Sequence, residues 1–311
     1  MIEIKKKKNF ELQILLGASA ILSRFGELNH ILKKDGFTKF EKIYSIVEGE
    51  NLTTMAKSTG LSIIETSTFF EKYRPDAVIV IADRFENLSV AIAASYLNIP
   101  LIHIQGGEVT GSIDEKVRHS ITKLSDIHFV ATKRSRDFLI KMGENKRNVY
   151  LTGCPSIDIA YQAKSKLPKN FFKKNKGVGN FPKYKEKYIV VMHHPETTKF
   201  NETYVQIQQT IEAILKINNI KIVWLWPNID AGSDIISKQL RILRENKFAS
   251  NISYFKNFSP EDYIKLIYNS ECLVGNSSSG IRESSFLGIP VVNIGFRQKN
   301  RERGFNVFDV G

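Results

Sequence analysis

The sequence lacks the marks of several large protein classes. It has two cysteines, Cys154 and Cys272, with no disulfide or metal-ligand spacing, which argues against a disulfide-stabilised or zinc-stabilised domain. No apolar run approaches the roughly 20 residues that a membrane-spanning helix needs. The short apolar stretch 12–16 follows Lys5–Lys8 as in a signal peptide, but polar residues at 11 and 13 interrupt it. We therefore expect a cytoplasmic protein with no membrane partner.

Recognisable nucleic-acid motifs are also missing, although the formal net charge is +13. Much of the basic excess lies in the segment 164–187, which also contains prolines and glycines. Such a composition is typical of a solvated linker, and no aromatic platform or basic helix accompanies it. We expect no nucleic-acid partner; weak steering of an anionic substrate is the smaller role that the charge permits.

The histidines do not form a metal-binding pattern. His193 and His194 are adjacent, so on a strand their side chains point to opposite faces and cannot both ligate one ion. His119 lies among acidic residues, but without an established zinc spacing. The sequence therefore predicts a site without a metal, and we expect no cofactor.

Apolar runs that alternate with helical patterns predict an α/β protein. Before the basic segment the expected strands are 77–82, 101–105, 127–131 and 149–152, and after it 188–192, 221–226 and 252–255. The run 77–82 is continuously apolar, as in a strand buried on both faces. We expect two Rossmann-like parallel-sheet domains facing a cleft. The predicted divisions are an N-terminal domain 1–163, a linker 164–187 and a C-terminal domain 188–311.

Polar clusters follow several of these strands. Ligands of parallel α/β sheets bind beyond the carboxyl ends of the strands, so these clusters are the candidate site. One carboxylate at a helix start is more often a cap than a catalytic group, but three acidic clusters in one half are harder to explain as caps. Carboxylates that face a shared cleft raise one another's pKa, which separates acid and base roles. The clusters contain Asp83, Glu108, Asp114, Glu115, Arg118 and His194.

The loop Gly275–Glu283 (GNSSSGIRE) follows another apolar run and opens an expected helix that ends at Gly288. Small residues and free backbone N–H groups at a helix start let a phosphate approach closely. Glu283 lies where a carboxylate could accept a ribose hydroxyl. A serine-rich helix cap without a ligand is the alternative, but the α/β context favours a nucleotide diphosphate site.

The ordered set of motifs resembles the UDP-N-acetylglucosamine 2-epimerase family, in particular its hydrolysing branch, which supplies sialic and related nonulosonic acids. The resemblance covers nearly the whole chain and implies a glycosyltransferase B fold. Relative to that family both ends look truncated, with the C-terminal domain incomplete. The motifs that carry the resemblance are Ala82–Glu86, Ile99–Ser125, Gly153–Asp158, His193–Pro195, Asn276–Glu283 and Gly288–Gly304.

The resemblance implies elimination of UDP from C1 of the sugar with loss of the C2 proton, followed by addition of water to the glycal. UDP-N-acetylglucosamine is the expected substrate; a related sugar such as UDP-diacetylbacillosamine, or a non-catalytic UDP-sugar-binding remnant, stays open. A homo-oligomer is also implied. The implied acid/base and charge-stabilising carboxylates are Asp83, Glu108 and Glu115, with Asp114 as the alternative to Glu115. His194 would lie at the diphosphate. The implied substrate-binding residues are Arg118, Ser278, Ser279, Gly280, Arg282 and Glu283.

Overall fold

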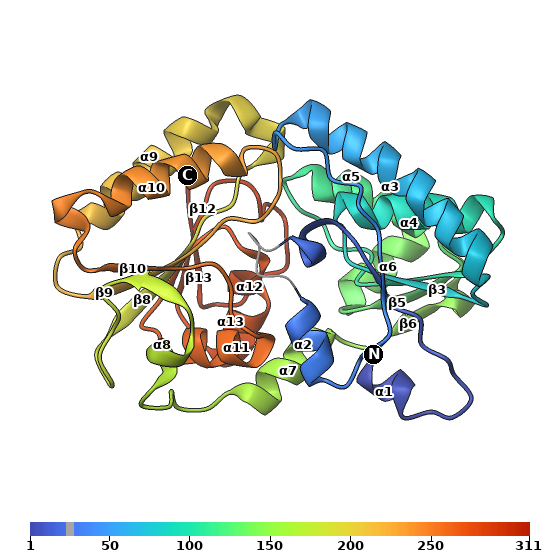
Figure 1. Cartoon of the computed structure of the whole chain (residues 1–311), viewed down its shortest axis with the longest axis horizontal. Coiled ribbons are helices and arrows are strands. Elements are labelled where there is room, and N and C mark those ends of the chain that lie inside the picture. Colours follow the sequence, from blue (N-terminus) through green and yellow to red (C-terminus); the bar gives the residue numbers. More distant parts are fainter. Residues whose placement is uncertain (23–27) are drawn as a thin grey trace.

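The computed structural model of the chain describes residues 1–22 and 28–311. The elements lie in two lobes side by side (Figure 1). The first lobe contains α1 Ile2–Lys5, β1 Leu15–Leu16, η1 Ala18–Ile21, α2 Asn29–Lys34, β2 Glu41–Lys42, α3 Leu52–Tyr73, β3 Val78–Ile81, α4 Phe85–Tyr96, β4 Leu101–Ile104, α5 Ile113–Leu124, β5 Ile127–Val130, α6 Lys133–Lys141, η3 Lys146–Asn148 and β6 Val149–Leu151. No helix in the described ranges is long and apolar enough to cross a membrane.

The second lobe begins with the helix that follows β6. Its elements are α7 Pro155–Ala163, α8 Phe171–Lys174, β7 Gly177–Gly179, β8 Tyr188–Met192, η4 Thr197–Glu202, α9 Thr203–Leu215, β9 Lys221–Leu225, α10 Ser233–Arg244, η5 Lys247–Ala249, β10 Ile252–Phe255, α11 Pro260–Tyr268, β11 Leu273–Gly275, α12 Ser278–Ile281, α13 Glu283–Leu287, β12 Val291–Ile294 and β13 Val307–Val310. The α/β alternation expected from the sequence is confirmed.

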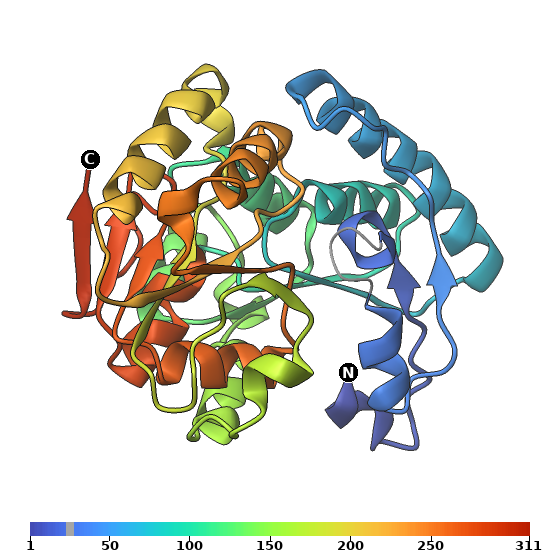
Figure 2. The ribbon, with the colours of Figure 1, turned by 60° about the vertical axis from the view of Figure 1, so that its left-hand side comes forward.

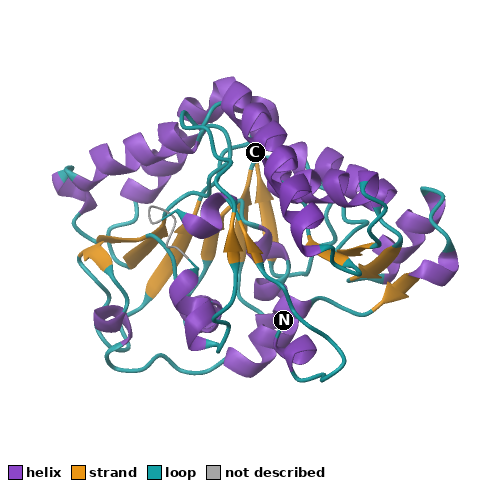
Figure 3. Ribbon diagram, turned by 45° about the vertical axis from the view of Figure 1, so that its right-hand side comes forward, coloured by secondary structure: helices purple, strands orange, loops and turns teal. Residues whose placement is uncertain are grey.

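The main sheet of the first lobe has four parallel strands in the order β3-β4-β5-β6. Helices gather on the upper side of the strands in Figure 3. In the first lobe, α4 packs against both α3 and α5. The expectation that the run 77–82 is buried on both faces is wrong, because Ile79 and Ile81 are 43% and 52% exposed. Only the alternate residues Val78 and Val80 lie in the core, since β3 is an edge strand among the described residues.

The N-terminal segment contributes a separate pair of strands. The apolar stretch 12–16 contains the short strand Leu15–Leu16, which pairs with β2 in a parallel two-stranded sheet. In Figure 2 these blue strands lie apart from the strands of the main sheet. Ile14, Leu16, Leu32 and Phe37 form a small core of their own beside this pair.

The sheet of the second lobe has seven strands in the order β13-β12-β11-β8-β9-β10-β7. Among the described residues, every pairing in it is parallel except that of β7 with β10. All five residues of β8 are buried, as expected for a central strand with a core on each face. Separate apolar clusters cover the two faces, one around Val190 and Phe255 and the other around Val191 and Trp224.

The segment 164–187 is more than a solvated linker. Phe171 and Phe172 of α8 are buried in the second lobe's core, and β7 extends its sheet as an antiparallel edge strand. The helix α7, assigned from the sequence to the first domain, packs on α11 and α13 and buries Ala160 and Ala163 in that same core. The lysine-rich composition concealed these apolar anchors, and we propose that the division between the lobes lies before α7.

Candidate active site

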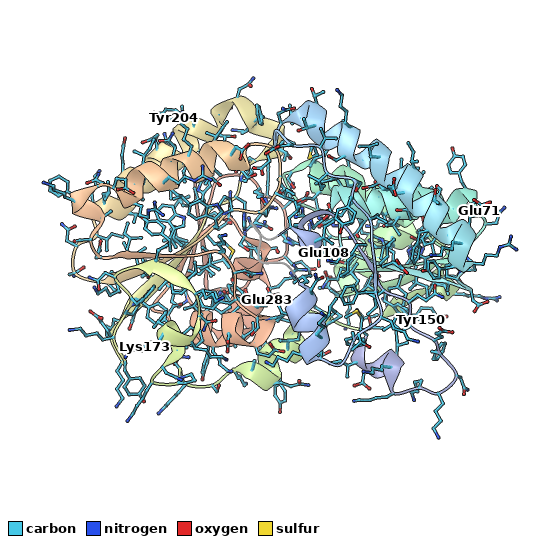
Figure 4. All side chains as sticks on the ribbon, in the orientation of Figure 1. Glu71, Glu108, Tyr150, Lys173, Tyr204 and Glu283 are labelled. Carbon is cyan, nitrogen blue, oxygen red and sulfur yellow. The ribbon has the colours of Figure 1, made fainter. Side chains whose placement is uncertain are left out.

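The two lobes meet through the loops that follow their strands. In the loop after β4, the backbone N–H of Gly111 donates to Arg297 O at 3.1 Å, and Thr198 Oγ1 donates to Gly111 O at 3.1 Å. A side chain at position 111 would collide with the Phe296 backbone, so glycine permits this close approach. The strand ends of both lobes therefore face a common region, in which Figure 4 labels Glu108 and Glu283.

Backbone kinks position the polar groups of the first lobe. Ala82 after β3 and Gln105 after β4 have φ angles of 64° and 69°, in the left-handed region that residues with a Cβ rarely occupy. Such strain is often found at functional sites, where the surrounding fold holds it in place. It directs the chain at Asp83 and at the Gly106–Glu108 loop away from the strand direction.

Asp83 is held by a buried arginine. Arg118, which is 1% exposed in its side chain, donates through Nε to Asp83 Oδ2 at 3.0 Å and adds a second bond through Nη2. Burial acts to raise the pKa of Asp83, but the Arg118 guanidinium outweighs it and the pKa lies below its usual value. The same guanidinium donates to the backbone oxygen of Glu108, so one arginine fixes both acid-bearing loops.

Glu108 forms an ion pair across the lobes with Arg301. The side chains of Glu108 and Arg301 are 9% and 7% exposed, so both charges are largely withdrawn from water. Arg301 Nη1 also donates to Gln298 Oε1 at 2.7 Å, and Gln298 in turn donates to the backbone of Asn276 at 2.9 Å. The Glu108 carboxylate is thereby linked to the loop that precedes the serines.

Asp114 and Glu115 lie in the first turn of the helix α5. Ser112 caps it by accepting from the backbone N–H of Asp114 at 3.3 Å. Asp114 faces the second lobe, where Arg297 Nη2 lies 3.4 Å from its carboxylate. Burial raises the pKa of Asp114 to about 6 against the attraction of Arg297. Glu115 instead accepts from the N–H of Thr110 at 2.7 Å, so Asp114 is the acid of this pair that meets the second lobe.

His194 is a buried, neutral imidazole. Burial and the nearby Arg297 lower its pKa well below the ordinary value. Its Nδ1 accepts from the backbone N–H of Asn228 at 3.2 Å, which assigns the ring proton to Nε2 as a potential donor. The side-chain amide of Asn276 makes two hydrogen bonds with the backbone of His194. It accepts from the His194 N–H at 2.7 Å and donates to the His194 carbonyl at 2.8 Å.

The serine loop forms two short helices instead of the single expected helix. The backbone bends at Arg282, which lies between α12 and α13. Ser277 caps α12, while Ser279 is hydrogen-bonded to the Tyr263 hydroxyl inside the lobe. Gly280 packs against β12, because an added Cβ would lie 3.0 Å from Val291 Cγ1. Ser278 is therefore the predicted serine whose hydroxyl contacts the interlobe residue Arg282.

Arg282 joins the two candidate half-sites. Its Nη2 donates to Ser278 Oγ at 2.9 Å, and its Nη1 donates across the lobes to Gln105 Oε1 at 3.0 Å. Glu283, which follows it, is 8% exposed. Its Oε2 has no hydrogen-bond partner within the described part of the chain. A buried, unpaired carboxylate oxygen of this kind is suited to accept a ligand hydroxyl.

The sequence analysis missed several interlobe residues. Arg297 Nη2 lies 3.5 Å from Asp230, and Arg84 Nη1 lies 3.6 Å from the same carboxylate. Arg301 and Gln105 make the further contacts described above. Two features of the sequence could have pointed to these residues: the three arginines within Arg297–Arg303 and Asp230, the acid that follows β9. Their partners, however, are far away in sequence.

The site combines hydrogen-bond donors and acids without an evident metal centre. Within the described residues, no group of three or more His, Cys, Asp and Glu side chains is arranged to hold a metal ion. What the geometry offers is a set of acids in the first lobe facing arginines, a neutral histidine and hydroxyls in the second. This arrangement suits a ligand that is anionic at one end and develops positive charge at the other.

Comparison with known proteins finds similar chains and similar folds. The UDP-N,N'-diacetylbacillosamine 2-epimerase (hydrolyzing) of Legionella pneumophila is 34% identical over 99% of this chain and 79% of its own length. The polysialic acid biosynthesis protein P7 of Escherichia coli is 35% identical over 92% of this chain and 71% of its own. The crystal structure of UDP-GlcNAc 2-epimerase from Neisseria meningitidis bound to UDP-GlcNAc has a TM-score of 0.70 at 18% identity, covering 94% of this chain and 77% of that one.

These similarities confirm the predicted glycosyltransferase B type of fold and the resemblance to the hydrolysing branch. The family match extends over residues 2–311, which includes every strand of the two facing sheets. The chain therefore belongs to the UDP-N-acetylglucosamine 2-epimerase family.

Proposed function

We propose that the protein is a hydrolysing 2-epimerase of a UDP-2-acetamido sugar, converting UDP-N-acetylglucosamine to N-acetylmannosamine and UDP. The observation that carries the proposal is Arg282, which contacts Ser278 on the diphosphate side and Gln105 beside the acids. A sugar–diphosphate bond between the lobes would lie next to donors for the leaving group and acids for the sugar. The hydrolysing relatives support the reaction type.

The first step is elimination: the C1–O bond breaks with its electrons going to UDP, and a base takes the C2 proton. Ser278, Arg282 and the His194 Nε2–H would stabilise the departing diphosphate. Asp83, ionised beside Arg118, and Glu108 would stabilise positive charge at the ring. Glu283 would accept from the ribose.

We assign the proton transfers to Asp114. Its pKa of about 6 is close to neutrality, so it can take the C2 proton and later return a proton. In the second step water adds its hydroxyl to C1 and a proton to C2, on the face that gives the manno configuration. Glu115 remains the alternative base, although its bond to Thr110 N holds it at its own loop.

A closely related substrate is the second candidate. The relative from Legionella pneumophila is named as a UDP-N,N'-diacetylbacillosamine 2-epimerase, and one from Campylobacter jejuni as a GDP/UDP-N,N'-diacetylbacillosamine 2-epimerase. UDP-diacetylbacillosamine has the same C1 and C2 chemistry. The elimination and hydration steps above apply to it unchanged.

The test is incubation of the purified protein with UDP-N-acetylglucosamine in D2O. We expect UDP and N-acetylmannosamine that carries deuterium at C2, both detected by NMR. The exposed variant Glu71→Gln, on α3, serves as the control and should behave as the wild type. A folded protein that binds UDP in calorimetry but releases no product from either UDP-sugar would contradict the proposal and indicate a binding protein instead.

Cytoplasmic location and a homo-oligomeric state remain predictions. Fractionation of cells that express the protein tests the first, and light scattering of the purified protein tests the second. A single mass of 35.4 kDa in solution would contradict the expected oligomer.

A further inference from the structure

The segment 196–198 contacts both sides of the Asp114–Arg297 ion pair. It follows β8 and His194 and belongs to the second lobe. Its first two residues, Glu196 and Thr197, are 2% and 7% exposed, so their polar atoms are largely withdrawn from water. Neither of them takes part in the catalytic steps described above.

Glu196 holds the backbone from which the Arg297 side chain extends. Its Oε1 accepts from the backbone N–H of Phe296 at 2.6 Å and from that of Arg297 at 3.1 Å. Two successive N–H groups that converge on one oxygen form a small anion-binding nest. Gly295 makes room for it, because its φ is 70° and a Cβ at this position would collide with the carboxylate. The origin of the arginine side chain is thereby fixed within the second lobe.

Thr197 fixes the first turn of α5 from across the lobes. Its Oγ1 accepts from the backbone N–H of Ile113, the first residue of that helix, at 3.3 Å. This N–H is one of those that a helix leaves without an internal partner. The neighbouring Thr198 donates to Gly111 O, and Gly111 N–H donates to Arg297 O, each at 3.1 Å. The helix of the acid and the loop of the arginine are therefore both attached to the same segment.

This attachment sets a separation on which the charge state of Asp114 depends. Arg297 Nη2 lies 3.4 Å from Asp114 Oδ2. Burial raises the pKa of Asp114 to about 6, and Arg297 is the strongest influence that lowers it. A guanidinium held farther away would leave the pKa higher, because burial would be less opposed. Asp114 would then be protonated at a pH at which it has to act as a base.

We propose that Glu196 and Thr197 are positioning residues of the active site, which set the separation of Asp114 and Arg297 across the lobes and thereby prepare Asp114 to take a proton. The inference rests on the proposed function for the role of Asp114. Both residues act through the backbone that they hold and not through contact with the sugar.

Charged and titratable groups from both lobes surround the Asp114–Arg297 pair. They are Asp83 and Arg84 after β3, Glu115 and Arg118 of α5, His193, His194 and Glu196 after β8, and Asp230 after β9. Substitution of Thr197 leaves all of these charges unchanged. A shifted titration of Asp114 in a Thr197 variant therefore reports a moved guanidinium and not a lost charge.

The test measures the titration of Asp114 in Thr197→Val, which lacks the hydroxyl, and in Thr197→Ser, which keeps it. Urea titrations over a range of pH compare each variant with the same variant carrying Asp114→Asn, so the pH dependence of the difference in unfolding free energy reports the pKa of Asp114. We expect Thr197→Val to raise this pKa by roughly 0.5 to 1 and Thr197→Ser to leave it as in the wild type. Thr68→Val, on the exposed side of α3, is the matched control.

Steady-state kinetics with UDP-N-acetylglucosamine provide the functional readout. For Thr197→Val, kcat/KM should fall roughly three- to tenfold at about pH 5 and by less than about twofold at about pH 8, because the acid limb of the profile reports the ionisation of the base. Glu196→Met, which removes the acceptor of the two N–H groups, should shift the profile in the same direction and covers the case in which Thr197→Val does not fold. Glu196→Gln keeps an acceptor oxygen and should restore the wild-type profile.

The outcomes separate this inference from the proposed function. An equal loss of kcat/KM at every pH, with an unchanged titration of Asp114, would indicate a purely structural role and overturn the inference. Product release with a wild-type titration of Asp114 in both Thr197→Val and Glu196→Met would leave the hydrolysing activity standing and the inference rejected. A shifted titration in a protein that releases no product from either UDP-sugar would do the reverse.

Discussion

The two lobes support their halves of the site in different ways. The second lobe encloses a seven-stranded sheet between two apolar clusters, and its serine loop follows directly from a strand buried in that sheet. The first lobe has a four-stranded sheet with one face only partly covered, and its acids rely on charged partners. The comparison shows that one half-site is held by packing and the other by electrostatics.

Much of this electrostatic support crosses the interface. Glu108 pairs with Arg301 and Asp114 with Arg297, so the second lobe supplies cations for acids of the first. Asp83 is the exception, because its partner Arg118 lies in the same lobe. Separation of the lobes would therefore remove the cationic partners of Glu108 and Asp114, while the serine loop would keep its packing within the second lobe.

The largest effect should come from Asp83→Asn. The amide keeps the shape and can still accept from Arg118, but it removes the negative charge at the reacting ring. We expect UDP release to fall roughly 10²- to 10⁴-fold, while UDP affinity stays within about twofold because the diphosphate contacts lie in the other lobe. A coupled assay measures the rate of UDP release, and calorimetry measures the affinity for UDP. Asp137→Asn on exposed α6 is the control, and equal losses of binding and turnover would contradict the division between the lobes.

Arg301→Met should cost stability by leaving the buried Glu108 carboxylate unpaired. The expected loss in the free energy of unfolding is about 3–5 kcal/mol, measured by denaturant titration. Adding Glu108→Gln should recover part of it. Arg136→Met is the matched control, since its partner Asp137 is 57% exposed in its side chain and the expected loss is below about 1 kcal/mol. Similar losses in the two arginine variants would argue against a special role for the buried pair.

A matched pair of core substitutions sharpens the comparison. Leu101 in β4 and Leu273 in β11 are both 0% exposed, so truncation of either to alanine should cost about 2–5 kcal/mol. Leu273→Ala should weaken UDP binding, because Leu273 Cδ2 would lie 3.3 Å from a Cβ placed at Gly280 in the serine loop. Leu101→Ala should lower kcat and spare UDP affinity. The opposite pattern in calorimetry and kinetics would refute the assignment of binding and chemistry to separate lobes.

The smallest effect concerns pH. The pKa of Asp114 is raised from 3.8 to about 6 in the folded state, so its stabilising contribution is full below about 3.8 and is lost as pH rises through about 6. The wild type should therefore lose stability relative to Asp114→Asn between pH 4 and pH 7, compared by urea titration at each pH. Parallel stability curves for the two proteins would show that this carboxyl is not perturbed.

Local patterns were enough to place the strands that precede the candidate residues. Continuous apolar runs such as 188–192 and 222–225 became buried parallel strands, because a strand covered on both faces has no polar position. The hydrophobic pattern gave wrong expectations at two places, where the tertiary structure decides which residues are buried. Ile79 and Ile81 are exposed because β3 lies at a sheet edge, and the lysines of 164–187 hid the buried Phe171.

The amino-acid sequence by itself determined the α/β class, the order of the strands along the chain and the candidate loops, since hydrophobic periodicity and small-residue turns are local properties. Only the tertiary structure decided which acid meets which arginine, that Asp114 and not Glu115 faces the second lobe, and that residues of both lobes line a cavity beside Glu108. Ion pairs such as Arg301–Glu108 join residues 193 positions apart. The folding of both lobes brings them together, and no local spacing encodes that contact.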